Sequence, residues 1–319
     1  MHSNLKSPTT WAEDYFSANG IVIQHTPEVI HEEPWASVHR ISTSSGIFYL
    51  KKMVPAFDIE PNLIHFLRDL FPKLLPEVVI QSESLHCFLM RDCGTPLQTI
   101  LRANYQVDLA IKGLTAYATI QKGAANHIDA LLALGVPDWR LAALPSLYMA
   151  FLDKDDFLKS YGLTQTEIDE LKHSHHKVIE LCHQLAQYHI PEAIDHSDFH
   201  DNNILVNDHN DLIVNDWGEA VITHPFFSLV NFLFGAARQH NIIEGSETYN
   251  ELRDGYLINW LTFESKDRLL DAYKLVQQLG YIKYVLSFYP ITQCPGYIEY
   301  GRHKGRITQA LRSFLQSIL

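Results

Sequence analysis

One stretch of the chain, residues 194–219, limits the possible folds more than any other. Its sequence, IDHSDFHDNNILVNDHNDLIVNDWGE, alternates short apolar runs with polar clusters. Short strands joined by polar turns have this pattern. The polar segment NDHND between the runs 204–206 and 212–214 predicts a hairpin turn. Such a hairpin would place Asn203 and Asp216 at the same end of one β-ribbon, where they can share an ion.

Two carboxylates and an amide stand at the loop ends of this stretch. Asp198 and Asn203 form an Asp-x-x-x-x-Asn pattern, and Asp216 follows before a hydrophobic residue and a glycine. This spacing is typical of kinase-type phosphoryl transfer, in which one carboxylate accepts or orients the proton of a substrate hydroxyl. Magnesium prefers oxygen ligands, so we predict Asp198 as the base and Asn203 and Asp216 as metal ligands. The alternative is a polar hairpin whose loop carboxylates cap nearby amides.

The same residues carry a resemblance to a known family. The segment HSDFHDNN, which begins at His196, resembles the His-Gly-Asp-Leu-His-x-x-Asn loop of aminoglycoside phosphotransferases and their choline-kinase-like relatives. The segment DWG at Asp216 resembles the metal-binding segment that follows it there. Phe199 and His200 stand where that family, but not the protein kinases, has Leu-His. The resemblance implies an α/β (α+β) bilobal fold of the protein-kinase type, with His200 as a further residue of the catalytic loop.

The first part of the chain has the pattern of a small sheet. Helix-compatible residues 9–19, with Thr10 as a possible cap, precede a β-branched run over residues 21–30. Residues 35–43 and 46–53 alternate in polarity across a Ser-Ser-Gly turn and predict a hairpin.

Lys51 ends the second strand of that hairpin. The resemblance implies that Lys51 grips the α- and β-phosphates of ATP, and Lys52 points away because strand side chains alternate. Glu60 stands at the start of a helix predicted over residues 61–70. The resemblance pairs Glu60 with Lys51. The alternatives are a lysine kept for solubility and a glutamate favoured by the helix dipole.

The segment 88–94 predicts a strand that runs into a glycine-containing turn. The resemblance places the hinge between the lobes here, with the backbone of Met90, Arg91 and Asp92 holding adenine. An ordinary strand end is the alternative. We therefore expect residues 1–92 to form a nucleotide-binding N-lobe and residues 93–319 a helical C-lobe that carries the catalytic loop and the substrate pocket.

The rest of the chain is predominantly helical in pattern. Two long helices are expected over residues 108–134 and 164–188, separated by the Pro- and Gly-punctuated segment 135–163. Histidines of the second helix are expected on the surface rather than at a metal: His173, His175, His176 and His183. Further helices are expected over 224–237, 246–261, 265–279, 281–288 and 302–319.

Composition restricts the class of protein and of partner. The chain has 37 acidic residues against 25 Lys and Arg, a net charge of −12, which disfavours nucleic acid and permits a cationic partner. The four cysteines form no Cys-x-x-Cys pair, and no signal pattern or long apolar run is present. We expect a soluble cytoplasmic protein that does not enter membranes.

Together these features predict an ATP- and Mg²⁺-dependent phosphotransferase that acts on a hydroxyl of a small molecule, such as an aminoglycoside, amino-alcohol or sugar. Two departures from the family favour an alternative, a nucleotide-binding regulator without turnover. The expected phosphate loop, residues 33–37, contains no glycine, and Ser228 stands near the place where the family commonly has Asp. A protein kinase is disfavoured because no Ala-Pro-Glu follows Asp216. The identity of the acceptor, the choice of ATP over GTP and the oligomeric state stay open.

Overall fold

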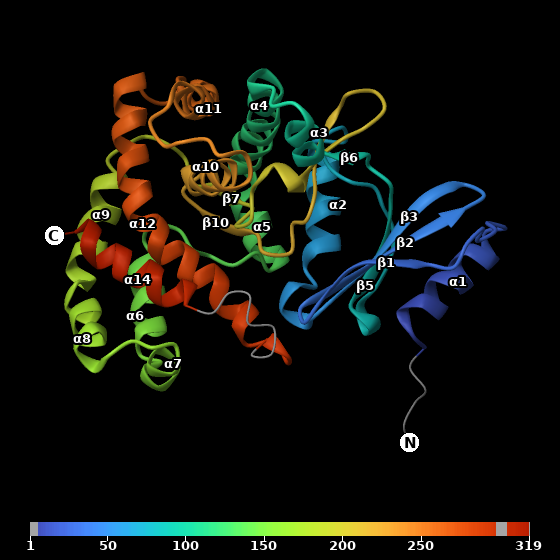
Figure 1. Ribbon diagram of the computed structural model, residues 1–319, viewed down its shortest axis with the longest axis horizontal. Coiled ribbons are helices and arrows are strands. Elements are labelled where there is room, and N and C mark those ends of the chain that lie inside the picture. Colours follow the sequence, from blue (N-terminus) through green and yellow to red (C-terminus); the bar gives the residue numbers. More distant parts are fainter. Residues whose placement is uncertain (1–5, 298–304, 319) are drawn as a thin grey trace.

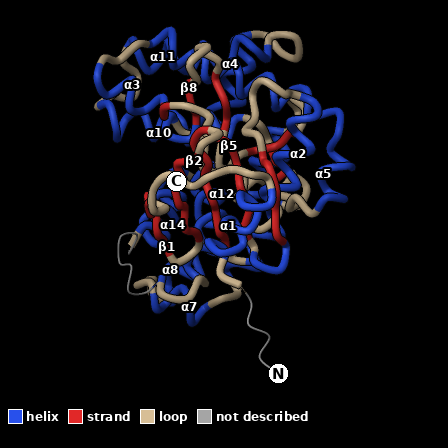
Figure 2. Tube along the Cα trace, turned by 90° about the vertical axis from the view of Figure 1, so that its right-hand side faces the viewer, coloured by secondary structure: helices blue, strands red, loops and turns tan. Residues whose placement is uncertain are grey.

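The computed structural model describes residues 6–297 and 305–318 and consists of two lobes (Figure 1). A five-stranded sheet dominates the first lobe, and helices dominate the second. In the view turned by 90°, strands run through the middle of the molecule with helices around them (Figure 2). The predicted fold class, a bilobal α+β fold of the protein-kinase type, is confirmed.

The first lobe is an antiparallel sheet with one helix before it and one inserted in it. Its elements are α1 (Pro8–Ala18), β1 (Glu28–Glu33), β2 (Ala36–Thr43), β3 (Gly46–Met53), α2 (Glu60–Leu70), β4 (Val78–Ser82) and β5 (Cys87–Arg91). The strand order is β1-β2-β3-β5-β4. The predicted hairpin is present as β2 and β3. It turns at Gly46, whose φ of 101° suits a residue without a Cβ.

Alternation along β3 gives the sheet two different faces. Phe48 and Leu50 lie on one face in a cluster with Phe16 of α1, whose ring centroid is 5.1 Å from that of Phe48. Lys51 and Met53 lie on the other face, toward α2 and the second lobe. The period of two in the sequence therefore selects which lysine faces the second lobe.

The start of the chain differs from prediction at the cap of α1. Ser7, not Thr10, caps the helix, because its Oγ accepts a hydrogen bond of 3.1 Å from the backbone N–H of Thr10. Pro8 occupies the first turn, where its missing N–H costs nothing.

The strand predicted over residues 21–30 is wrong in extent. Only Ile23 bridges to the sheet, opposite Thr43, and β1 begins at Glu28. Pro27 explains the gap, because it has no N–H to donate to a strand ladder.

The second lobe contains helices and three short ladders. Its elements are β6 (Thr95–Pro96), α3 (Leu97–Ala103), α4 (Val107–Ala124), α5 (Ile128–Leu134), α6 (Leu144–Leu152), α7 (Asp155–Ser160), α8 (Gln165–His173), α9 (His175–Leu185), β7 (Ala193–Asp195), β8 (Ile204–Val206), β9 (Leu212–Val214), β10 (Val221–Thr223), α10 (Phe226–His240), α11 (Glu247–Leu257), α12 (Lys266–Thr292) and α14 (Arg306–Ser317). β7 pairs with β10, and β6, β8 and β9 form a second sheet. Because β5 ends the first sheet and β6 already pairs in the second lobe, we propose residue 92 as the boundary.

Two predicted helices are divided, and two others are fused. The helix predicted over residues 108–134 is divided into α4 and α5 by a 3₁₀ turn at Ala125–His127. The helix predicted over residues 164–188 breaks into α8 and α9 at Ser174, whose Oγ donates to the Leu171 carbonyl at 2.7 Å. The helices predicted over 265–279 and 281–288 form the single helix α12. Gly280 does not interrupt it, because the helix packs there against α10.

Two other differences concern helix extent. The segment 135–163, expected to separate helices, itself contains α6 and α7. The last helix begins at Arg306 rather than residue 302, and positions 302–304 of that prediction lie outside the described residues.

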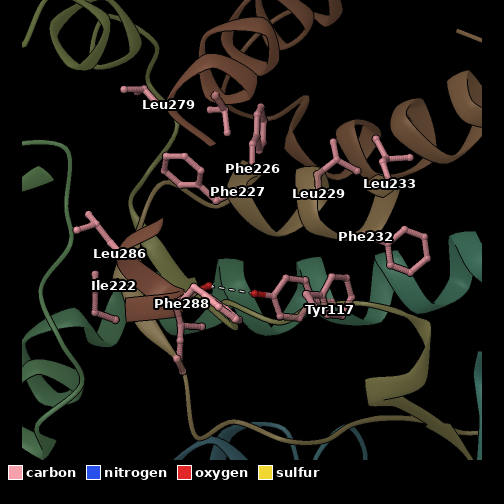
Figure 3. Packing of buried hydrophobic residues seen from close by; sticks show 14 of the residues in the cluster. Tyr117, Ile222, Phe226, Phe227, Leu229, Phe232, Leu233, Leu279, Leu286 and Phe288 are labelled. Atoms are coloured by element: carbon pink, nitrogen blue, oxygen red, sulfur yellow. Dashed lines mark hydrogen bonds between the residues drawn. The ribbon is translucent and has the colours of Figure 1, made fainter. Parts of the chain in front are cut away.

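In the main core of the second lobe, α4 and α10 pack against the loop that contains Phe199. Figure 3 shows Tyr117 of α4 together with Phe226, Phe227 and Phe232 of α10 in this core. Tyr117 stacks on Phe199, with ring centroids 3.9 Å apart. The loop that contains Phe199 is thus packed against α4 and α10. Within residues 6–297 and 305–318, no helix is both long and apolar enough to cross a bilayer.

Candidate active site

A cleft of about 790 Å³ lies between the lobes and collects the residues predicted from the motifs. It is lined by the predicted candidates Lys51, Glu60, Met90, Arg91, Asp92, Asp198, His200, Asn203 and Asp216. Segments that are far apart in the sequence therefore meet at one place. The surfaces that face one another are β3 and α2 on one side and the loop after β7 on the other.

Lys51 lies at the centre of the nucleotide side of the cleft. Its Nζ is 2.6 Å from Oε2 of Glu60 and 2.5 Å from Oδ1 of Asp216, and its side chain is buried, whereas Lys52 is exposed. Burial opposes the charge on Lys51, but Asp216 and Glu60 outweigh it and raise the pKa of the ammonium group. Lys51 is therefore a fixed cation that faces the cleft, as the strand register predicts.

Glu60 links the lysine to the metal-binding segment. Its Oε1 accepts a 3.1 Å hydrogen bond from the backbone N–H of Trp217, while its Oε2 contacts Lys51. Burial raises the pKa of Glu60 to about 6, although Lys51 opposes the rise. Glu60 also begins α2, so the two interpretations of this residue are compatible.

The catalytic loop places Asp198 between a histidine and an amide. Nε2 of His200 is 3.3 Å from Oδ2 of Asp198, and Nδ1 of His200 accepts from the backbone N–H of Asn202. Nδ2 of Asn203 donates to the Asp198 carbonyl at 2.9 Å. Burial raises the pKa of Asp198, but His200 outweighs this and lowers it to about 2. Asp198 is therefore an ionised carboxylate whose orientation is fixed by its neighbours.

The hairpin brings the two candidate metal ligands to the same end of one ribbon. Ile204 pairs with Val214, and the N–H of Asn215 donates to the carbonyl of Asn203 at 2.9 Å. Because the amide nitrogen of Asn203 is occupied by Asp198, its oxygen is the atom left for a metal. Asp216 gives one oxygen to Lys51 and keeps the other free. One amide oxygen and one carboxylate oxygen fit Mg²⁺ that also binds phosphate.

One of the candidate ligands and one residue of the catalytic loop have left-handed backbone. Ser197 has φ 67° and Asp216 has φ 70°. Residues other than glycine adopt this conformation uncommonly, and such residues cluster at active sites. At Ser197 the resembling loop has glycine, which adopts it freely. The structure thus reproduces the backbone that the glycine would allow.

His196 supports the loop from inside the protein. It is buried beside Trp217, with ring centroids 4.9 Å apart, and its Nε2 lies 2.7 Å from the Asn215 carbonyl. Burial lowers the pKa of His196, so the ring is neutral and donates from Nε2. It therefore joins the loop before Asp198 to the segment before Asp216.

Sequence reasoning missed a buried ion pair beneath the loop. Lys283 of α12 lies 2.5 Å from Asp195, and both side chains are almost fully buried. Ser228 of α10 donates to the other oxygen of Asp195 and is 2.7 Å from the hydroxyl of Tyr117. The departure noted at Ser228 therefore places a hydroxyl donor beside the carboxylate of Asp195. Lys283 gave no signal, because it lies in the apolar second half of α12 and no sequence period identifies its partner.

A second unpredicted contact holds the other side of the loop. Asp201 is buried, and its Oδ2 is 2.5 Å from Nε2 of His240 on α10. Its Oδ1 accepts from Gln98 of α3 at 2.9 Å. The loop that carries Asp198 is therefore tied to α3 and α10 as well as to α12.

The turn expected to cover phosphates is short. Residues 34 and 35 alone separate β1 from β2, and Trp35 and Ala36 line the cleft, whereas Ser37 does not. A serine hydroxyl over the phosphates is therefore not provided here. At the hinge, Asp92 accepts a 2.9 Å hydrogen bond from the N–H of Gly94, which closes the turn between the lobes.

The histidines of α8 and α9 lie away from the cleft. His173, His176 and His183 are exposed, as predicted, whereas His175 is half-buried rather than on the surface. Within the part of the chain that the structure describes, no group of three or more His, Cys, Asp or Glu side chains is arranged to hold a metal.

No protein-family model matches this chain, and no curated protein matches its sequence. Solved structures do share its fold. The ethanolamine kinase of Plasmodium vivax has a TM-score of 0.62 at 12% identity, covering 94% of this chain and 85% of that one. The choline kinase of Streptococcus pneumoniae has a TM-score of 0.59 at 13% identity, covering 97% and 99%.

A structure of the aminoglycoside phosphotransferase APH(2")-IIa with gentamicin has a TM-score of 0.61 at 13% identity, covering 98% of this chain and 97% of that one. At such low identity the likeness establishes the fold. That fold is the one shared by these small-molecule phosphotransferases, and the resemblance predicted from the catalytic loop is confirmed at this level.

Proposed function

We propose that the protein is a phosphotransferase that moves the γ-phosphoryl group of ATP to a hydroxyl of a small molecule. The observation that carries this proposal is the cleft in which Lys51, bound to Glu60 and Asp216, faces the ionised Asp198. A shared fold alone would not support it, because one fold hosts many functions.

In the proposed reaction Asp198 accepts a hydrogen bond from the acceptor hydroxyl and orients its oxygen toward the γ-phosphorus. The new O–P bond forms as the bond from phosphorus to the β,γ-bridging oxygen breaks, and ADP leaves with that electron pair. The hydroxyl proton passes to Asp198. With a pKa of about 2, Asp198 is a weak base, so its main role is to orient the acceptor hydroxyl. This suits phosphoryl transfer through a loose, largely dissociative transition state.

The nucleotide side is proposed to act by charge. Lys51 would donate to the α- and β-phosphates once they replace Asp216 as its partner, and Glu60 would keep it in place. Met90, Arg91 and Asp92 would hold adenine through their backbone. Mg²⁺, when bound with the nucleotide, would neutralise phosphate charge. In this chain its ligands would be the amide oxygen of Asn203 and the free oxygen of Asp216, with His200 holding Asp198 in position.

The short β1–β2 turn favours a second candidate, a nucleotide-binding regulator without turnover, because it offers no glycine-rich cover for phosphates. A protein kinase is disfavoured, because only β10 separates Gly218 from α10 and leaves no room for an activation loop.

The test is ATP consumption by the purified protein with Mg²⁺ and a panel of aminoglycosides, amino-alcohols, sugars and hydroxy acids. Formation of a phosphate ester, seen by phosphorus NMR and absent in Asp198→Asn, is expected. ATP binding without ester formation from any hydroxyl compound would favour the regulator instead.

A further inference from the structure

The part of the cleft on the far side of Asp198 from the nucleotide residues contains positively charged side chains, although the chain as a whole is negatively charged. Its wall is formed by α10, α12 and the first turn of α14, and it includes Arg238, Tyr284 and Arg306. The net charge of −12 suggested that a cation could bind. Local charges decide recognition inside a cleft, however, so the side chains there carry more weight than the total.

Neither arginine is neutralised by an acidic side chain. Among the described residues, no carboxylate forms an ion pair with Arg238 or Arg306. Arg238 lies with its guanidinium 5.6 Å from the centre of the Phe234 ring. Elsewhere on α14 the situation is different, because Arg312 lies 2.6 Å from Glu167. The cleft therefore contains two guanidinium groups that have no carboxylate partner among the described residues.

Tyr284 lines the same cleft as the two arginines and Asp198. Burial raises the pKa of the Tyr284 hydroxyl, whereas Arg306, which hydrogen-bonds to it, and Arg238 oppose the rise; Asp198 adds to it. All three charges thus act on one hydroxyl group. Tyr284 also stacks on Phe288, with the ring planes 6° apart, so the wall that presents Arg306 is rigid.

The opposing charge in this part of the cleft is Glu219. It lines the cleft without a hydrogen bond or ion pair among the described residues, and it lies near Asp198 and Asp216. Burial, together with these two carboxylates, raises the pKa of Glu219 well above its usual value. Arg238 and Arg306 outnumber Glu219, so these three side chains leave a net positive charge in this part of the cleft even when Glu219 is ionised.

We infer that the hydroxyl acceptor carries an anionic group, a carboxylate or a phosphate ester, which Arg238 and Arg306 bind while its hydroxyl lies against Asp198. Guanidinium groups suit this task because they donate two parallel hydrogen bonds to a planar or tetrahedral oxyanion. This inference rests on the proposed function, since it names the class of acceptor for the same site.

The first experiment measures binding, without any need for turnover. Glycerol, glycerate, glycerol 3-phosphate and ethanolamine are titrated into the wild-type protein by calorimetry, because they differ mainly in charge. At least one of the two anions is expected to bind at least about tenfold more tightly than glycerol and ethanolamine. Equal binding of all four, or the tightest binding by ethanolamine, would overturn the inference.

The second experiment assigns that binding to the arginines. Arg238→Gln and Arg306→Gln are each expected to weaken the anion about tenfold or more and to leave ADP binding unchanged. Arg312→Gln is the matched control, because it removes the same charge from the same helix outside the cleft. If Arg306→Gln weakens ADP and not the anion, the arginines serve the nucleotide and the inference is wrong.

The outcomes also separate this inference from the proposed function. Transfer to an uncharged or cationic hydroxyl compound, with the anions excluded, would keep the phosphotransferase and reject the anionic acceptor. Anion binding that depends on both arginines, without transfer to any hydroxyl, would support the anion site and reject the phosphotransferase.

Discussion

Replacing Lys283 by Met tests the buried ion pair beneath the catalytic loop. In the wild-type protein the Lys283 ammonium lies 2.5 Å from the Asp195 carboxylate. Methionine has a similar length and no charge, so the change leaves Asp195 buried without its cation. Removing one partner of a buried pair costs about 3–5 kcal/mol, because an uncompensated charge stays in the interior. Asp195 is fully inaccessible, so the upper half of this range is expected.

The assay is thermal unfolding followed by circular dichroism. Unfolding entropy scales at about 2.1 cal/mol/K per residue, so for 319 residues unfolding together 1 kcal/mol shifts Tm by about 1.5 °C. Lys283→Met, at about 4–5 kcal/mol, should therefore lower Tm by about 6–7.5 °C. Lys274→Met is the matched control on the same helix; its exposed ion pair with Asp271 should be worth less than about 1 kcal/mol.

A second substitution makes the reasoning refutable. In the double variant Lys283→Met with Asp195→Asn, the charge left behind is removed, and most of the lost stability should return. If the double variant is less stable than Lys283→Met, or if Lys283→Met equals the Lys274→Met control, the pair does not neutralise a buried charge.

Four further outcomes concern the site. Asp198→Asn should lower turnover about 100- to 10,000-fold with little change in Tm, and a near-normal rate would remove it from the reaction. Lys51→Ala should raise the KM for ATP far more than Lys52→Ala, and the reverse result would contradict the strand register. Asp216→Asn should lower turnover in a way that added Mg²⁺ partly restores, measured as rate against Mg²⁺ concentration; unchanged dependence would place the metal elsewhere. Because the pKa of Glu60 is raised to about 6, its protonation below that pH removes a partner of Lys51, so turnover should fall there, and Glu60→Gln should lack this acid limb.

The local parts of the site could be predicted because local patterns specify them. The β2–β3 hairpin, the orientation of Lys51 and the shared end of Asn203 and Asp216 follow from alternation and turn residues. Contacts between distant segments could not be predicted in this way. Lys283, in the apolar second half of α12, has no sequence period that reveals its partner.

The same reason explains the errors in helix boundaries. Gly280 resembles a helix end in the sequence, but packing against α10 keeps α12 continuous. The presence of Arg238, Tyr284 and Arg306 in one cleft likewise depends on how α10, α12 and α14 pack. The fold class and the catalytic loop could therefore be predicted from the sequence. The cleft wall formed by α10, α12 and α14 could not, because it depends on tertiary packing.

The position of Lys283 late in the chain has a consequence for the order of folding during synthesis. The sheet of the first lobe is complete in sequence once Arg91 has been made, so Lys51 and Glu60 can pair early. Asp195 lacks its cation until α12 has left the ribosome. Because domains fold as units as the chain emerges, the catalytic loop should reach its final form only after α12 has been made. A nascent chain stopped before α12 would hold a folded nucleotide lobe beside an unfinished catalytic loop.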